Sequence, residues 1–212
     1  MRIDFVSDVT CPWCAIGFTA LERAIERLGA EVTVELHLQP FELNPGMPPE
    51  GEDIVGYMRR KYGLTAEQVA ERRAVIRSRG AEVGFAFGQR THVWNTFDAH
   101  RLLHWADLEG RSRELKRALL AAYHTRGENP GSHEVLLRLA GEVGLDVERG
   151  RAVLESGQYA AEVRGQAMHW QRLGIHSVPS VIVDGRHLIQ GGQPVEVFEK
   201  ALREIAAGGR PA

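Results

Sequence analysis

Cysteine is nearly absent from this sequence. The 212 residues contain only two cysteines, Cys11 and Cys14, separated by Pro12 and Trp13. A single pair excludes the cysteine-rich scaffolds of small secreted domains. Because no further cysteine is present, we expect that any redox cycling of the pair depends on another molecule.

The sequence also lacks a strong excess of charge and a long apolar run. Its formal net charge is −2, so it has no basic field for nucleic acid, and no apolar stretch approaches membrane-spanning length. The N-terminus carries Asp4 where a signal peptide needs a long apolar segment. We therefore expect a cytoplasmic protein without nucleic-acid or membrane partners. In that compartment a cysteine pair is more often catalytic or redox-sensing than a static cross-link.

The pair lies where an apolar run, residues 3–6, gives way to an amphipathic helix. Apolar residues follow Cys14 at helical spacing: Phe18, Leu21, Ile25 and Leu28. Cys14 therefore belongs to the buried face, and Cys11 lies at the helix start, where Pro12 suits the first turn. Unpaired backbone N–H groups and the helix dipole at that end favour a thiolate. Cys11 is thus expected to be the nucleophile and Cys14 the resolving thiol.

Three other interpretations of the pair stay open. The cysteines could be two buried structural thiols. They could form half of a zinc site, with His100 and His104, four residues apart on a predicted helix, as the other ligands. They could also serve glutathione chemistry without disulfide exchange. The strand-to-helix position of the pair argues against buried structural thiols. Both histidines lie in an apolar helix stripe, which argues against the zinc site.

Hydrophobic periodicity predicts a β-α-β unit at the start of the chain. A strand over 3–7 precedes the helix over 12–28, which Gly29 ends, and a strictly alternating strand over 32–39 follows until Pro40 stops it. The two strands of such a unit are parallel. The cysteines then lie at the carboxyl end of the first strand, where open α/β sheets place their sites.

Residues 41–49 form a connector, and the next hundred residues are almost wholly helical. Helices are predicted over 54–62, 65–79, 95–108, 113–125, 134–143, 147–155 and 159–173, with a glycine-spaced loop over 80–88. The second of these helices carries four arginines, Arg72, Arg73, Arg77 and Arg79. We interpret this basic side as solvated surface.

The end of the chain predicts a β-hairpin and a final helix. Strands over 181–183 and 187–190 flank Asp184 and Gly185, a composition that favours a type I′ turn. The dipeptide Val178-Pro179 comes directly before the hairpin. Pro194 opens the last helix, whose buried stripe is predicted to consist of Val195, Phe198, Leu202 and Ile205.

Together these elements resemble the thioredoxin fold, and the helical insertion resembles its DsbA-like branch. Four motifs resemble the FrnE-type subfamily of cytoplasmic oxidoreductases: residues 5–14 with the cysteines, 40–45, 95–102 and 177–180. The expected fold class is therefore α/β, a thioredoxin fold with a large all-helical insertion. Its first half spans residues 1–49, the inserted helical domain 50–157, and the second half 158–212.

The resemblance implies a protein disulfide oxidoreductase that acts by thiol–disulfide exchange, in the reductase or isomerase direction. It implies partners that are protein or small-molecule thiols and disulfides, no metal and no bound cofactor, with glutathione or another thiol as a candidate co-substrate. It also implies a cis peptide bond at Val178-Pro179, facing the cysteines. The implied catalytic residues are Cys11, Cys14 and Pro179, and the implied substrate-binding residues are Pro12, Trp13 and Val178.

The rival function is that of a glutathione-dependent isomerase or transferase. Hydroxychromene-carboxylate isomerases and kappa-class glutathione transferases resemble this chain in architecture. They typically carry serine where this sequence has Cys11, and they need no resolving thiol. The presence of Cys14 therefore favours redox exchange.

The helical insertion is expected to pack over the cysteine end of the sheet and to bound a groove. Candidates to line that groove are Trp13, Met58, Trp94, Phe97 and His100. Asp8, three residues before Cys11, is expected to cap the helix rather than to relay a proton. Because Trp13 carries no charge, the pair should be less oxidising than relatives with histidine at this position.

Overall fold

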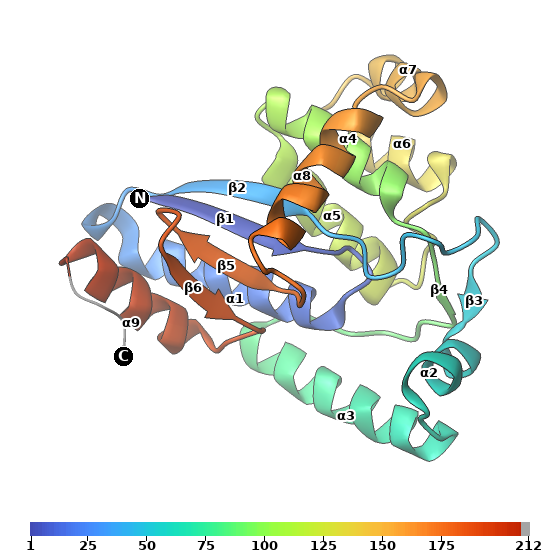
Figure 1. Ribbon diagram of the computed structural model, residues 1–212, viewed down its shortest axis with the longest axis horizontal. Coiled ribbons are helices and arrows are strands. Elements are labelled where there is room, and N and C mark those ends of the chain that lie inside the picture. Colours follow the sequence, from blue (N-terminus) through green and yellow to red (C-terminus); the bar gives the residue numbers. More distant parts are fainter. Residues whose placement is uncertain (209–212) are drawn as a thin grey trace.

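The computed structural model describes residues 1–208 as a sheet flanked by helices, with further helices to one side (Figure 1). The chain begins with β1 (Arg2–Ser7), α1 (Pro12–Leu28), the 3₁₀ turn η1 (Gly29–Glu31) and β2 (Glu35–Pro40). The intervening elements are β3 (Glu52–Asp53), α2 (Ile54–Tyr62), α3 (Ala66–Val83), β4 (His92–Val93), α4 (Phe97–Leu108), α5 (Ser112–His124), α6 (His133–Glu142), α7 (Val147–Ser156) and α8 (Ala160–Arg172). The last elements are β5 (Ser180–Val183), β6 (His187–Gln190) and α9 (Val195–Ala206). Within residues 1–208, no helix has both the length and the apolar character that crossing a membrane requires.

The larger sheet of the described residues has four strands in the order β2-β1-β5-β6. β1 runs parallel to β2, with Phe5 opposite Leu38, and antiparallel to β5, with Phe5 opposite Val181. The predicted parallel β-α-β unit is confirmed. β2, however, begins three residues later than predicted and retains Pro40, which lies opposite Ser7. Because β2 is an edge strand, it tolerates a residue without an N–H.

The final hairpin has the predicted turn geometry. Asp184 and Gly185 both have positive φ, 49° and 65°, as a type I′ turn requires. The N–H of Arg186 closes the turn by donating to the Val183 carbonyl at 3.0 Å. The hairpin and its turn residues are therefore confirmed, but the pairing of Val183 with His187 makes the connection three residues long, with Arg186 as the additional residue.

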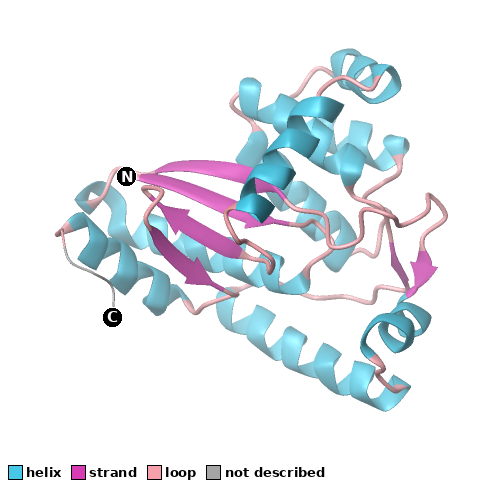
Figure 2. Cartoon of the chain, viewed as in Figure 1, coloured by secondary structure: helices cyan, strands magenta, loops and turns pink. Residues whose placement is uncertain are grey.

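Successive side chains of the sheet enter two different cores. Phe5 and Val181 belong to the main core, which lies between the sheet and the helices α1 and α9. Val6 and Ile182, one residue along each strand, pack with Trp170 of α8. Figure 2 shows α1 and α8 on opposite faces of the sheet. Because alternate side chains of a strand point to opposite sides, both faces of the sheet are buried at β1 and β5.

The helices α4 to α7 enclose a core of their own around Trp105, Leu119 and Leu136. Val9, in the loop between β1 and α1, is completely buried in this same core. The Nε2 atom of His124, at the end of α5, lies 2.9 Å from the Val9 carbonyl oxygen. The helical insertion therefore holds the loop that leads into Cys11.

α3 is longer than the sequence predicted. It continues through Gly80 to Val83 and ends at Gly84, whose φ of 81° suits glycine. A Cβ atom at Gly80 would lie 2.5 Å from the Phe87 ring, so glycine lets the following chain fold back against the helix. The prediction of a loop from residue 80 was wrong for its first four residues. A packing glycine inside a helix has the same sequence signature as a terminating one.

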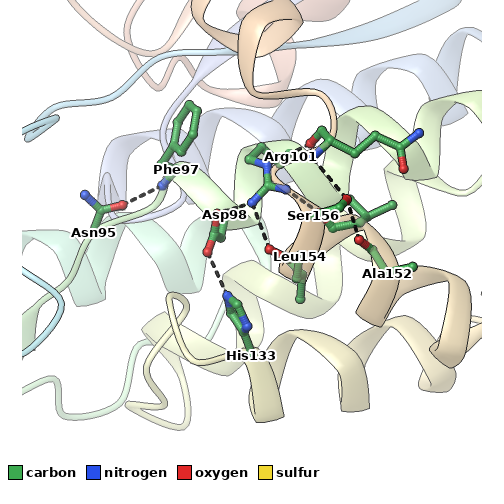
Figure 3. Close-up of polar contacts among 10 residues, drawn as sticks. Asn95, Phe97, Asp98, Arg101, His133, Ala152, Leu154 and Ser156 are labelled. Carbon is green, nitrogen blue, oxygen red and sulfur yellow. Dashed lines mark hydrogen bonds and ion pairs between the residues drawn. The ribbon is translucent and has the colours of Figure 1, made fainter.

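The motif over residues 95–102 forms a structural joint between α4 and α7 (Figure 3). The Arg101 guanidinium is buried and donates to Asp98 at 2.6 Å, to the Leu154 carbonyl at 3.3 Å and to the Gln158 carbonyl at 2.8 Å. It also donates to the Val153 carbonyl. One side chain thus satisfies carbonyl groups in the last turn of α7 and just after the end of that helix.

Replacing Arg101 by alanine is expected to lower the free energy of unfolding by about 3 kcal/mol, because buried carbonyls lose their donors. Urea unfolding followed by circular dichroism measures the loss. Arg138→Ala is the matched control, since Arg138 is exposed and pairs with Glu142 on the surface. That variant should lose less than about 1 kcal/mol. Equal losses in the two variants would contradict the role given to Arg101.

Candidate active site

The start of α1 presents the two cysteines differently. Cys11 is the N-cap residue, with an extended backbone (φ −80°, ψ 116°), and Pro12 takes the first helical position. The Cys11 carbonyl accepts hydrogen bonds from the N–H groups of Cys14 at 3.1 Å and Ala15 at 3.3 Å. Cys11 keeps 5% of its surface exposed, whereas Cys14 is completely buried. Only Cys11 can therefore meet a partner from solvent.

Burial also separates the two thiols chemically. It raises the pKa of the Cys14 thiol well above its ordinary value, and the adjacent Cys11 sulfur raises it further. The charge of Lys116, on α5, opposes this rise. Lys116 is itself 1% exposed, and burial lowers the pKa of its ammonium group. The helical insertion thus supplies a buried cation to the buried thiol.

The loop before β5 reaches the same point. The Val178–Pro179 peptide bond is cis, and the Val178 carbonyl oxygen lies 3.7 Å from the Cys11 Sγ atom. The Pro179 ring packs against α1 at Gly17, where a Cβ atom would come within 3.0 Å of the proline Cγ. Glycine at position 17 therefore allows the loop and the helix to approach closely. The structure brings Cys11, Val178 and Pro179 together.

Asp8 lies beneath the helix start without capping it. Its carboxylate accepts from the N–H groups of Leu43 at 2.7 Å and Thr10 at 3.3 Å, and it lies 3.6 Å from the His100 Nε2 atom. The first turn of α1 has no side-chain cap, so the capping prediction was wrong. Three residues before the N-cap, Asp8 is directed toward the connector after β2 and toward α4 instead.

The surroundings of Asp8 favour its ionised form. Burial alone would raise the pKa of Asp8, but the nearby His100 imidazole and the hydrogen bond from the Leu43 N–H outweigh this effect. The pKa of Asp8 is therefore lower than its ordinary value. A buried carboxylate thus joins the active-site loop to the helical insertion.

A cavity of about 610 Å³ lies beside Cys11. Cys11, Pro12, Trp13 and Val178 form part of its wall, and the connector after β2 and the helices α2 and α3 form much of the rest. Trp13 is 37% exposed on this wall. All the residues predicted to bind substrate therefore border one cavity.

The aromatic candidates for this groove divide into two groups. Trp13 and Met58 line the cavity, whereas Trp94, Phe97 and His100 do not. Phe97 lines a separate cavity near the connector, and His100 is buried against Asp8. The expectation was wrong for these three side chains because helical spacing does not say which neighbour a buried face contacts. Tyrosines of α2 and arginines of α3 line the cavity beside Cys11 in place of these three side chains.

The histidines of the zinc interpretation are engaged elsewhere. His100 lies next to Asp8, and the His104 ring packs on Tyr159, with 4.9 Å between the ring centroids. Across residues 1–208, no group of three or more histidine, cysteine, aspartate or glutamate side chains is placed to hold a metal ion. The cysteines therefore have no second pair of ligands beside them in the described chain.

Comparison with known proteins places this arrangement in a family. The sequence profile of the DSBA-like thioredoxin domain matches residues 2–203. The chain therefore belongs to the DsbA-like thioredoxin family. The crystal structure of SCO1869 from Streptomyces coelicolor, a probable DsbA oxidoreductase, superimposes with a TM-score of 0.91. It is 34% identical, and the match covers 100% of this chain and 92% of that one.

Two further proteins match over almost their whole length. The YwbO protein of Bacillus subtilis (strain 168) is 29% identical over 205 residues, which is 96% of each chain. The cytosolic disulfide reductase DsbM of Pseudomonas aeruginosa, solved with GSH, has a TM-score of 0.67 at 18% identity and covers 98% of each chain. At that identity the likeness to DsbM shows the fold alone. Membership of the DsbA-like family implies an oxidoreductase.

Lys116 and His124 were not among the candidates from the sequence of this DsbA-like protein. Both lie on the buried face of α5. His124 meets the Val9 carbonyl of the active-site loop, and the charge of Lys116 acts on Cys14. The signal for Lys116 was its position between Leu115 and Leu119, where an amphipathic helix normally buries apolar residues. A charged residue inside an apolar stripe is the pattern that identifies such a group.

The lowered pKa of Asp8 predicts a pH-dependent stability. The carboxylate stabilises the folded protein above its unfolded-state pKa of 3.8, and this contribution disappears as the pH falls through the lower folded-state pKa. Asp8→Asn is therefore expected to lower the free energy of unfolding by about 2 kcal/mol at neutral pH.

Urea unfolding of the native chain and of Asp8→Asn, at pH values from about 7 down to about 3, measures this dependence. The difference between the two proteins should shrink as the pH falls. A difference that stays constant or grows toward low pH would contradict the assignment of an ionised, stabilising Asp8.

Proposed function

We propose that this chain is a thiol–disulfide oxidoreductase of the FrnE type, with Cys11 as nucleophile and Cys14 as resolving thiol. The observation that carries the proposal is the unequal exposure of two cysteines one helical turn apart at the start of α1. Exchange through a mixed disulfide needs one sulfur that meets the partner and a second that displaces it. Cys11 and Cys14 have these two positions.

In the reductase direction, the Cys11 thiolate attacks one sulfur of a partner disulfide. A new sulfur–sulfur bond forms, the partner disulfide breaks, and the other partner sulfur leaves as a thiolate. Deprotonated Cys14 then attacks the Cys11 sulfur and releases the first partner sulfur. The cysteine pair has lost two electrons and two protons, and the partner, after taking up the protons, holds two thiols. The oxidase direction is the reverse.

The environment of Cys14 fits the order of these steps. Since burial raises the pKa of Cys14, its thiol stays protonated while Cys11 reacts. Lys116 favours the Cys14 thiolate at the resolving step, because its charge opposes the effect of burial. The thiolate of the first step thus forms at Cys11, where a partner can reach it.

Pro12, Trp13 and Val178 are proposed to bind the partner, with Pro179 completing the site. Val178 offers backbone groups beside the Cys11 sulfur to an extended partner, in the manner of an added strand. Pro179 has no backbone N–H, and its ring packs on α1. The proline therefore does not cover the Val178 backbone groups that an extended partner would meet. Trp13 provides an exposed apolar surface next to the sulfur.

We further propose that the reaction takes place in the cytoplasm, with glutathione or another thiol as recycling co-substrate. The fold shared with DsbM, named as a cytosolic disulfide reductase and solved with GSH, supports this proposal. A reducing compartment favours the reductase or isomerase direction. The rival function, glutathione-dependent isomerisation or transfer, needs no second thiol. The buried Cys14 therefore argues for exchange.

Cys14→Ser is expected to trap the mixed disulfide. Incubated with oxidised glutathione, this variant should form one stable glutathione adduct on Cys11, because no thiol remains to displace it. The native protein should instead end with a Cys11–Cys14 disulfide and two molecules of reduced glutathione. Intact-mass spectrometry after acid quenching distinguishes these products.

Cys11→Ser is the matched control. It should form a glutathione adduct much more slowly than Cys14→Ser, because its remaining thiol, Cys14, is buried. The proposed function fails if native protein accumulates the adduct without closing the disulfide, or if Cys14→Ser stays unmodified. Either result would favour glutathione chemistry without exchange or a redox-inactive role.

A further inference from the structure

The basic side of α3 borders the cavity beside Cys11. Helical spacing places Val69, Arg73 and Ile76 on one face, and all three line that cavity. Arg72 lines it as well. The interpretation of these arginines as solvated surface was therefore wrong for Arg73, whereas Arg72 is exposed at the rim of the cavity. Arg73 is half-buried in the wall.

Arg73 is held close to a second cation, Arg90. The Arg73 guanidinium donates to the Arg90 carbonyl at 3.2 Å, and the Arg90 guanidinium lies 5.2 Å from the centroid of the Tyr123 ring. Burial lowers the pKa of Arg73, and the charge of Arg90 lowers it further. In the described part of the chain neither guanidinium forms an ion pair with a carboxylate. Two neighbouring cations raise each other's free energy, which a bound anion would relieve. The charge of Asp53 acts in the opposite sense on the pKa of Arg73 but does not outweigh burial and Arg90.

The cationic region continues into a second cavity. This cavity, of about 180 Å³, shares Arg73, Ile76 and Arg90 with the first and adds Arg77. Glu71, an exposed residue, lines the larger cavity, and no acidic residue of the described chain lines the smaller one. Guanidinium groups present several N–H donors in a planar fork that matches a carboxylate. The junction of the two cavities thus has the chemistry of an anion site.

The rest of the larger cavity is suited to an apolar body. Trp13, Tyr62 and Val75 are 37%, 50% and 54% exposed, and all three border it. Its volume of about 610 Å³ lies within the range of pockets that hold small molecules. This pocket has the Cys11 sulfur in one wall and cations in another. It therefore fits a ligand that carries a reactive sulfur and an anionic group.

We propose that the preferred partner of Cys11 is a small thiol or disulfide with an apolar body and a carboxylate, which Arg73 and Arg90 bind. The inference rests on the proposed function and adds the substrate class. The carboxylate anchors the ligand at the junction of the two cavities, and the apolar body lies along α2 and α3. Its sulfur is then held at Cys11.

Two aromatic disulfides test the proposal. 5,5′-Dithiobis(2-nitrobenzoate) carries a carboxylate on each ring, and 4,4′-dithiodipyridine is neutral at the same pH. Reduced protein attacks either reagent through Cys11 and then closes its disulfide with Cys14. The pair loses two electrons, its two protons pass to buffer or product, and each reagent is reduced to two coloured thiol products. Stopped-flow absorbance gives both second-order rate constants.

Arg73→Gln and Arg90→Gln should each lower the rate constant for the carboxylate reagent by roughly tenfold, the effect of one charge-assisted hydrogen bond. The rate constant for the neutral reagent should change less than about twofold in both variants. Arg73→Lys keeps the charge and should recover part of the loss. Arg59→Gln, an exposed α2 variant that removes a charge outside both cavities, controls for long-range attraction.

Benzoate should slow the reaction of native protein with the neutral reagent, and benzamide at equal concentration should not. The proposal is overturned if the arginine variants slow both reagents equally, or if Arg59→Gln matches their effect. It is also overturned if the variants slow only a glutamate-rich peptide disulfide, since that result assigns the arginines to a protein partner. In each of these cases Cys11 still exchanges, whereas failure to react with either reagent would instead overturn the proposed function.

Discussion

The chemistry depends on one junction, where β1 ends and α1 begins, being held from two directions. From the insertion side, Val9 is buried among the helices α4 to α7, and its carbonyl meets His124. From the sheet side, the loop before β5 brings Val178 to the Cys11 sulfur and packs Pro179 on Gly17. Cys11 is therefore fixed between two parts of the chain that are far apart in sequence. Neither part alone would fix both the sulfur and the surface that meets its partner.

Below the junction lies a group of buried ionisable side chains that links the two parts. Asp8 comes from the loop after β1, His100 and Lys116 come from the insertion, and each is at most 3% exposed. Buried charges are costly unless they interact with one another. These interactions change which protonation state is favoured. His100 favours the carboxylate form of Asp8, and Lys116 favours the thiolate form of Cys14. The same contacts that join the two parts also adjust the thiol chemistry.

Much of the fold was predictable because its signals are local. The helix over 12–28 follows from an apolar stripe, a proline at its start and a glycine after its end, and the final hairpin follows from Asp184 and Gly185. The cysteine pair follows from its spacing and its place at a strand-to-helix junction. Short strands such as β3, with two residues, have no periodicity and were missed.

The contacts between distant segments were not predictable in the same way. Nothing near Asp8 in sequence identifies Leu43 or His100 as its partners, so capping, the local alternative, was favoured wrongly. Arginines on a polar helix resemble solvated surface until the tertiary structure places Arg73 in a cavity wall. In both cases the deciding neighbour lies on another element, and a pattern within one element carries no information about it.

The thiol chemistry is tested most directly by the equilibrium of the cysteine pair with glutathione redox buffers, followed by intact mass and tryptophan fluorescence. We predict one two-electron transition in which a Cys11–Cys14 disulfide forms and the chain loses the mass of two hydrogens. Trp13→His should make that disulfide more oxidising, because a cation beside the pair stabilises its reduced form. If the cysteines of the folded protein never form this disulfide across the range of buffers, the central claim is contradicted.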